Sequence, residues 1–183
     1  SAAPVIGSSY TYCVVRPEGR RVSGELIDPQ RPVPDIAATA ADGGSVKLSS
    51  LKGQWLLVVT GSATCDAQCE QELYLQRQLR EGLGREKDRL DRVWLILDGQ
   101  PMPERLRVAM QGATVLQVPE AQLAQWLQPA PGHALADHMY LVDPMGNWMM
   151  RFPPRMDAEG ASRAKRDIER VLRASSSWDE AGR

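Results

Sequence analysis

Two cysteines, Cys65 and Cys69, are the residues of this 183-residue chain with the clearest capacity for chemistry. They stand four apart in the segment GSATCDAQCEQEL, which follows an apolar run and precedes a helix-like pattern. Two thiols at this spacing can form a disulfide and exchange it with another protein, or together bind a soft metal ion such as Cu(I). They can also be inert side chains at the start of a helix, so the elements around them have to be considered next.

The elements on either side place the first cysteine at a junction between a strand and a helix. The near-continuous apolar run QWLLVVTG at residues 54–61 is typical of a strand covered on both faces. Leucines that recur at four-residue steps predict a helix over residues 66–84, with Ser62 or Thr64 as its N-cap. The helix dipole and the free N–H groups of the first turn favour a thiolate, so we expect the pKa of Cys65 to lie below its usual value of about 8.5.

The spacing of the pair leaves its chemistry open. On a regular helix the Cβ atoms of residues four apart lie about 5–6 Å from each other, whereas a disulfide needs about 3.8 Å. A modest distortion of the first turn would close this gap, so Cys65 and Cys69 can be oxidised, reduced or bridged by a metal. A structural zinc site is disfavoured, because such sites need four ligands and the sequence has no second Cys/His pair.

The order of the predicted elements indicates an α/β protein. Alternating strands and helices require a central sheet with helices on both faces, and a closing antiparallel hairpin makes that sheet mixed. This order fits a thioredoxin-like fold with an N-terminal β-hairpin extension, divided into the extension at 1–22, the thioredoxin-like domain at 23–174 and a flexible tail at 175–183. We predict strands at 10–16, 23–27, 54–61, 93–99 and 113–119, a hairpin over 138–153, and helices at 66–84, 102–110, 120–128 and 157–174.

Composition argues against several classes of protein. The net charge of −1 indicates no partnership with nucleic acid, and no apolar run approaches the ~20 residues of a membrane span. Cys13, in the strand-like stretch YTYCVV, is expected to be a half-buried structural thiol. The sequence begins at SAAPVIGSSY without an initiator Met, as expected of a chain cut after a targeting or anchoring segment, or of a tag remnant.

Three segments of the sequence resemble the Sco (SenC) family. The first is GELIDPQRPVPDIAATAADGGSVKLSSLKGQWLLVVTG, the second is the C-x-x-x-C motif CDAQC, and the third is DHMYLVDPMGN. Together they cover most of residues 24–152. The C-x-x-x-C at the strand-to-helix junction is the most specific of them, because thioredoxins use C-x-x-C. Members of this family are membrane-anchored thioredoxin-fold proteins that assist assembly of the dinuclear copper centre of cytochrome oxidase.

The resemblance implies roles for three residues. It implies that Cys65 and Cys69 are redox thiols or copper ligands, and that His138, in the pair Asp137-His138, is the third copper ligand. The implied function is that of a Sco-like thiol–disulfide oxidoreductase, with Cys65 attacking and Cys69 resolving, or of a copper metallochaperone. Its partner would be a redox or copper-receiving protein such as a cytochrome oxidase subunit. Such a protein would lie in the periplasm or on another extracytoplasmic side of a membrane, anchored by a segment missing from this sequence.

Alternatives stay open at His138 and for the function as a whole. Alignment of HMYLVDPMGN with the same strand of thioredoxins places His138 at the cis-proline that faces the active-site cysteines, where it could bind a metal or assist the thiolate. It could equally be a strand-edge histidine bonded to a backbone carbonyl. A peroxiredoxin-like peroxidase is disfavoured, because Val58 occupies the position of the proline expected upstream of Cys65. A non-catalytic partner-binding module with this fold is the third hypothesis.

Overall fold

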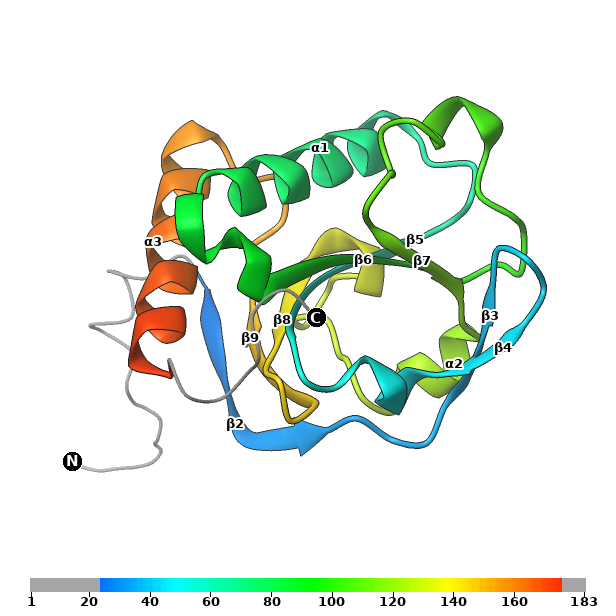
Figure 1. Ribbon diagram of the computed structural model, residues 1–183, viewed down its shortest axis with the longest axis horizontal. Coiled ribbons are helices and arrows are strands. Elements are labelled where there is room, and N and C mark those ends of the chain that lie inside the picture. The colour runs from blue at the N-terminus through cyan, green and yellow to red at the C-terminus, as the bar shows by residue number, and fades with distance from the viewer. Residues whose placement is uncertain (1–23, 176–183) are drawn as a thin grey trace.

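One mixed sheet of eight strands forms the centre of the protein. The computed structural model describes residues 24–175, and Figure 1 shows helices on both sides of the sheet. The strand order is β2-β9-β8-β5-β6-β7-β3-β4, which confirms the predicted α/β, thioredoxin-like fold. The elements are β2 (Glu25–Pro32), β3 (Ala37–Ala40), β4 (Ser45–Lys47), β5 (Trp55–Gly61), α1 (Ala67–Glu81), β6 (Leu90–Ile96), β7 (Thr114–Gln117), α2 (Glu120–Leu123), β8 (Met139–Val142), β9 (Asn147–Arg151) and α3 (Ala158–Ala174).

The strands at the centre of the sheet carry the apolar runs of the sequence. β5, β6 and β7 are parallel, and β8 lies antiparallel to β5 on its other side. All seven residues of β5 are buried, as expected of a strand covered on both faces. The cysteine loop follows β5 directly and leads into α1, so a fully buried strand fixes the position of the cysteine pair.

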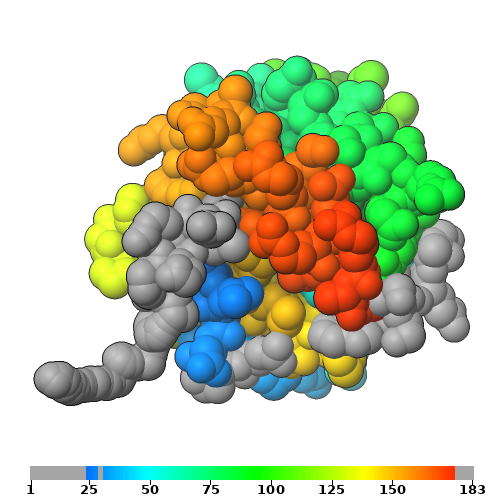
Figure 2. All heavy atoms as spheres, turned by 90° about the vertical axis from the view of Figure 1, so that its left-hand side faces the viewer, coloured from blue at the N-terminus to red at the C-terminus, as the bar shows by residue number. Residues whose placement is uncertain are grey.

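Two apolar clusters, one on each face of the sheet, hold the helices in place. On one face, Leu73 and Leu79 of α1 belong to the same cluster as Ile168 of α3. Figure 2 shows α3, coloured orange to red, lying beside α1, coloured green. On the other face, the cluster contains Leu123 of α2 and Leu127 just after it. Burial of each such side chain contributes about 2 kcal/mol to the free energy of folding. The packing of helices on both faces therefore depends on the apolar side chains that these helices turn toward the sheet.

The segment between β6 and β7 differs from the predicted helix at 102–110. Only a short 3₁₀ helix forms there, at Glu104–Leu106. Pro101 and Pro103 precede it, and a proline disfavours the helical conformation of the residue before it, so no helix begins at Met102. The segment is therefore a loop, and this loop brings Arg105 to the cysteine pair.

The N-terminal predictions can be followed only in part. The strand predicted at 10–16 and Cys13 lie outside the described residues, and the predicted domain limits stay predictions. The strand expected at 23–27 is β2, which continues to Pro32 and pairs with β9 at the edge of the sheet, where the missing N–H of proline is tolerated. No helix in the described part of the chain has the length and apolar character needed to span a bilayer.

Candidate functional site

A disulfide joins Cys65 and Cys69 at the carboxyl end of β5. Their Cα atoms are 5.0 Å apart. Cys69 lies in the first turn of α1, whereas Cys65 precedes the helix and has a φ of +47°. Residues other than glycine seldom adopt this left-handed conformation, which costs about 1–2 kcal/mol. The distortion that the spacing required is thus placed at Cys65, just before the helix begins.

The N-cap of α1 is Asp66, so the expectation of Ser62 or Thr64 is wrong. The Asp66 carboxylate accepts a hydrogen bond from the backbone N–H of Cys69 at 2.9 Å. The Cys65 N–H donates to the carbonyl of Ser62 at 3.1 Å, so residues 62–65 form a turn of their own and the helix starts after it. The positive end of the helix is therefore closer to Cys69 than the sequence suggested.

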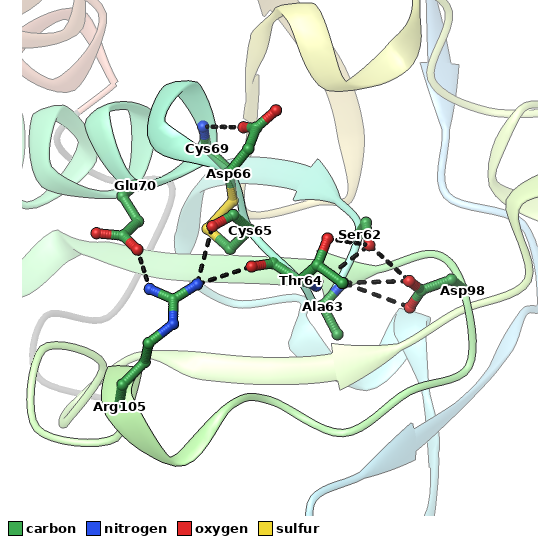
Figure 3. The surroundings of a disulfide bond; sticks show 9 residues. All are labelled: Ser62, Ala63, Thr64, Cys65, Asp66, Cys69, Glu70, Asp98 and Arg105. Atoms are coloured by element: carbon green, nitrogen blue, oxygen red, sulfur yellow. Dashed lines mark hydrogen bonds and ion pairs between the residues drawn. A yellow bond between two sulfur atoms is a disulfide. The ribbon is translucent and has the colours of Figure 1, made fainter.

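Arg105, from the loop between β6 and β7, holds the cysteine turn from outside (Figure 3). Its guanidinium donates hydrogen bonds to the carbonyl oxygens of Thr64 at 2.7 Å and of Cys65 at 3.0 Å. It also forms an ion pair with the carboxylate of Glu70, the residue after Cys69. One side chain therefore contacts the loop on both sides of the disulfide.

Asp98, which follows β6, holds the other end of the same turn. Its carboxylate accepts hydrogen bonds from the Ser62 hydroxyl at 2.6 Å and from the Ala63 N–H at 3.3 Å (Figure 3). The bond from Ser62 is the main cause of a pKa for Asp98 below its usual value. The loop that carries the disulfide is thus fixed by two charged groups from the single connection between β6 and β7, although most of it is exposed.

The two cysteines differ in accessibility. Cys65 is 2% exposed and belongs to the apolar cluster beneath α1, whereas Cys69 is only partly buried at the edge of that cluster. An open groove of about 350 Å³ lies between the start of α1 and the loop before α3. Its lining includes Gln68, which lies inside the C-x-x-x-C loop, and Glu72. The structure therefore places Cys69 at the more accessible end of the disulfide.

Glu72 is a titratable residue of this groove that the sequence analysis missed. It lies one turn after Cys69 and is only 3% exposed. Burial raises its pKa to about 7, and the negative charge of Asp137 adds to the rise. The signal was present in the spacing, because Cys69, Glu72 and Gln76 recur at three- and four-residue steps and so share a helix face. Gln76 is also buried and donates hydrogen bonds to backbone carbonyls of β5 and β6.

Both ring nitrogens of His138, which directly precedes β8, are used by backbone groups. Nε2 accepts a hydrogen bond from the Ala130 N–H at 3.1 Å, and Nδ1 donates to the carbonyl of Phe152 at 2.8 Å. His138 is 3% exposed, and burial holds its pKa below the usual value of 6.5. These contacts suit a neutral imidazole with its proton on Nδ1, and they match the alternative of a histidine bonded to a backbone carbonyl.

Alternation along β8 separates His138 from the cysteines. His138 shares a face with Tyr140, whose ring centroid is 6.1 Å from its own, whereas Met139 belongs to the cluster that contains Cys65. Among residues 24–175, no three His, Cys, Asp or Glu side chains lie close enough to hold a metal ion together. The structure brings Cys65 and Cys69 together and does not bring His138 to them.

A protein-family model covers the greater part of the chain. The family described as transmembrane-like, thioredoxin-like, C-terminal domain matches residues 55–175. This range contains the disulfide, all of α1 and His138. No curated protein matches the chain.

Several solved structures of Sco proteins share the fold. BsSco, a member of the Sco family of cytochrome c oxidase assembly proteins with a disulfide switch, is 18% identical, with a TM-score of 0.60 over 81% of this chain and 95% of that chain. A SCO1/SenC family lipoprotein from Bacillus anthracis is 16% identical, with a TM-score of 0.59 over 82% and 99%. ScoI from Arabidopsis thaliana, solved with copper bound, is 16% identical, with a TM-score of 0.58 over 84% and 99%. The resemblance to Sco proteins is thus confirmed in fold, at low identity.

Proposed function

The chain belongs to the family of transmembrane-like, thioredoxin-like C-terminal domains, and we propose that it uses this fold for thiol–disulfide exchange through Cys65 and Cys69. The observation that carries the proposal is the disulfide itself, in an exposed loop at the end of a buried strand. A cross-link over so short a loop restricts the unfolded chain less than one over a long loop does. A redox role therefore accounts for the bond better than a role in stability.

Cys69 is the cysteine that we expect to react with the partner, in contrast to the order of attack expected from the sequence. Cys65 is nearly sealed in the core, whereas Cys69 is partly accessible and its neighbour Gln68 lines the groove. A thiolate of the partner attacks the sulfur of Cys69, forms a mixed disulfide and releases Cys65 as a thiolate. A second thiolate of the partner then attacks the partner's own sulfur in the mixed disulfide and releases Cys69. The partner loses two electrons and gains a disulfide, and the cysteine pair takes up those electrons.

Single-cysteine variants test this assignment. In a Cys13→Ser background, Cys65→Ser leaves Cys69 as the one thiol, and Cys69→Ser leaves Cys65. We expect the Cys65→Ser protein to form a mixed disulfide with oxidised glutathione about tenfold faster than the Cys69→Ser protein does, because access to the remaining thiol limits this exchange. Mass spectrometry of quenched samples measures both rates. Equal rates would remove the assignment of Cys69, and two inert variants would remove the proposed function.

Copper is the second candidate, as a cargo held by the reduced pair. Two neighbouring thiolates suit Cu(I), a soft ion, and the fold shared with the copper-bound ScoI of Arabidopsis thaliana supports a cargo of this kind. The resemblance also implied His138 as a third ligand. Its ring would first have to release both backbone partners, so the proposed site consists of Cys65 and Cys69 alone. Loss of Cu(I) binding by either cysteine-to-serine variant is the expected result.

We propose a redox-active or copper-receiving protein as the partner, docked at the groove that Gln68 of the C-x-x-x-C loop lines. The disulfide-switch protein BsSco is a cytochrome c oxidase assembly protein, so a subunit of that oxidase is the first partner to test. We also propose a location outside the cytosol, since disulfides persist in oxidising compartments. The lipoprotein nature of the Bacillus anthracis neighbour supports a membrane anchor as part of the same proposal.

A further inference from the structure

Arg105 connects the two sides of the disulfide-bonded loop. One part of its guanidinium donates to the carbonyl oxygens of Thr64 at 2.7 Å and Cys65 at 3.0 Å. Another part pairs with the carboxylate of Glu70, which directly follows Cys69. Figure 3 shows the guanidinium lying between these groups. We name this set of contacts the Arg105 brace, and it spans the loop from before the first cysteine to after the second.

We propose that the Arg105 brace sets the redox stability of the Cys65–Cys69 disulfide by keeping the two thiols close together in the reduced protein. The inference rests on the proposed function, since it concerns a pair that cycles between disulfide and dithiol. It makes Arg105 a positioning residue, because its contacts are with backbone carbonyls and a carboxylate rather than with the reacting sulfur atoms.

The backbone of Cys65 is the part of the loop that needs to be held. Its φ of +47° is unfavourable for a residue with a side chain, so loss of the covalent link would let it relax to a more common conformation. The hydrogen bonds from Arg105 to Thr64 and Cys65 do not involve sulfur and can therefore persist in the dithiol. They keep the effective concentration of one thiol toward the other high, and a high effective concentration favours the disulfide.

The positive charge of Arg105 acts in the opposite direction. A cation close to a cysteine stabilises the thiolate and so favours the reduced pair. The carboxylate of Glu70 offsets this charge, and the two side chains are 50% and 47% exposed to screening solvent. The positioning effect should therefore exceed the effect of charge, and the sign of the change in redox potential distinguishes them.

Equilibration with glutathione measures the stability of the disulfide. Reduction of one protein disulfide converts two glutathione thiols into one glutathione disulfide, so the equilibrium constant compares the two bonds directly. We expect Arg105→Gln to be reduced about fivefold more readily than the wild type, a potential about 20 mV less negative, since a tenfold change corresponds to about 30 mV. Arg105→Lys should shift in the same direction, because an ammonium group cannot reproduce the planar fork of donors.

Arg107→Gln is the matched control. Arg107 lies two residues farther along the same loop, is 65% exposed and donates to the carboxylate of Glu104, so this variant should keep the wild-type potential. An unchanged or more negative potential in Arg105→Gln would overturn the brace. A wild-type potential in Arg105→Lys would show that the fork of hydrogen bonds to the carbonyls of Thr64 and Cys65 is not needed, and it would overturn the brace as well. If the wild-type protein had no reversible disulfide, both the proposed function and the brace would be contradicted. The wild-type measurement alone shows this, so it is distinguished from a failure of the brace, which needs the variants.

Discussion

In the loop of residues 62–70, exposed polar groups are held by Arg105 and Asp98 from the connection between β6 and β7, and one cysteine of the disulfide stays partly accessible. Around His138, the imidazole is buried and both of its nitrogens are used by backbone groups. The two regions lie at the same end of the central strands, because β5 ends where the antiparallel β8 begins. The difference teaches that a place next to the proposed site does not make a residue part of it. The face to which its side chain points decides that.

The largest effect on stability is expected from His138→Ala, which removes a buried ring from the second region. The change leaves the Ala130 N–H and the Phe152 carbonyl without these partners and opens a cavity. We expect the free energy of unfolding to fall by about 3 kcal/mol, measured by urea denaturation. His133→Ala is the matched control. Its side chain is partly exposed and pairs with Asp137, so its loss should cost less than about 1 kcal/mol.

The same variant tests whether the two regions are chemically separate. In reduced protein at a temperature where His138→Ala remains folded, its affinity for Cu(I) should equal that of the wild type, because the ring is not part of the proposed cysteine site. Competition with a chromogenic Cu(I) chelator measures this affinity. A loss of about tenfold or more would make His138 a ligand, and the contrast between the regions would no longer hold.

Glu72, one turn after Cys69 on α1, should give the next largest effect. Burial raises its pKa to about 7, with a further contribution from Asp137, so the folded protein binds this proton more tightly than the unfolded chain. Stability therefore falls as the pH rises from about 4.5 to about 7, and the loss is complete above that range. We expect Glu72→Gln to be about 2 kcal/mol more stable than the wild type near pH 8 and nearly equal to it near pH 4, by urea denaturation.

An exposed glutamate provides the control for this pH dependence. Glu120→Gln, at the start of α2, should alter the free energy of unfolding by less than about 0.5 kcal/mol at either pH. If Glu72→Gln were as stabilising near pH 4 as near pH 8, the buried charge could not be its cause. The ionisation of Glu72 would then have no part in the pH dependence of stability.

Strong local patterns were sufficient to predict the elements that bury apolar residues. β5, expected at 54–61, and α3, expected at 157–174, each have the predicted bounds to within one residue. Weaker patterns predicted two helices less well. The helix expected at 102–110 is a single 3₁₀ turn, and the helix expected at 120–128 ends at Leu123. Short segments of this kind depend on tertiary packing, which a single sequence does not display.

The cysteine pair could be predicted from the sequence, but most of its surroundings could not. Arg105 is 40 residues from Cys65 in the sequence, and its arrival depends on the path of a loop that was expected to be a helix. Asp66 was overlooked because three neighbouring polar residues could all have capped α1. The place of His138 required the exact start of β8, since a shift of one residue moves a side chain to the other face.

The smallest effect is expected from the helix caps, and it compares the cysteine loop with a part of the fold far from it in sequence. Asp66 caps α1 through the Cys69 N–H at 2.9 Å, and Asp157 caps α3 through the Gly160 N–H at 2.7 Å. Replacement of either by alanine should cost about 1 kcal/mol in urea denaturation of the reduced protein. In the oxidised protein the disulfide also holds the start of α1, so Asp66→Ala should cost less there, whereas Asp157→Ala should cost the same in both states. If the cost of Asp66→Ala did not depend on the redox state, cap and disulfide would act independently, and reduction would leave the start of α1 as well ordered as the start of α3.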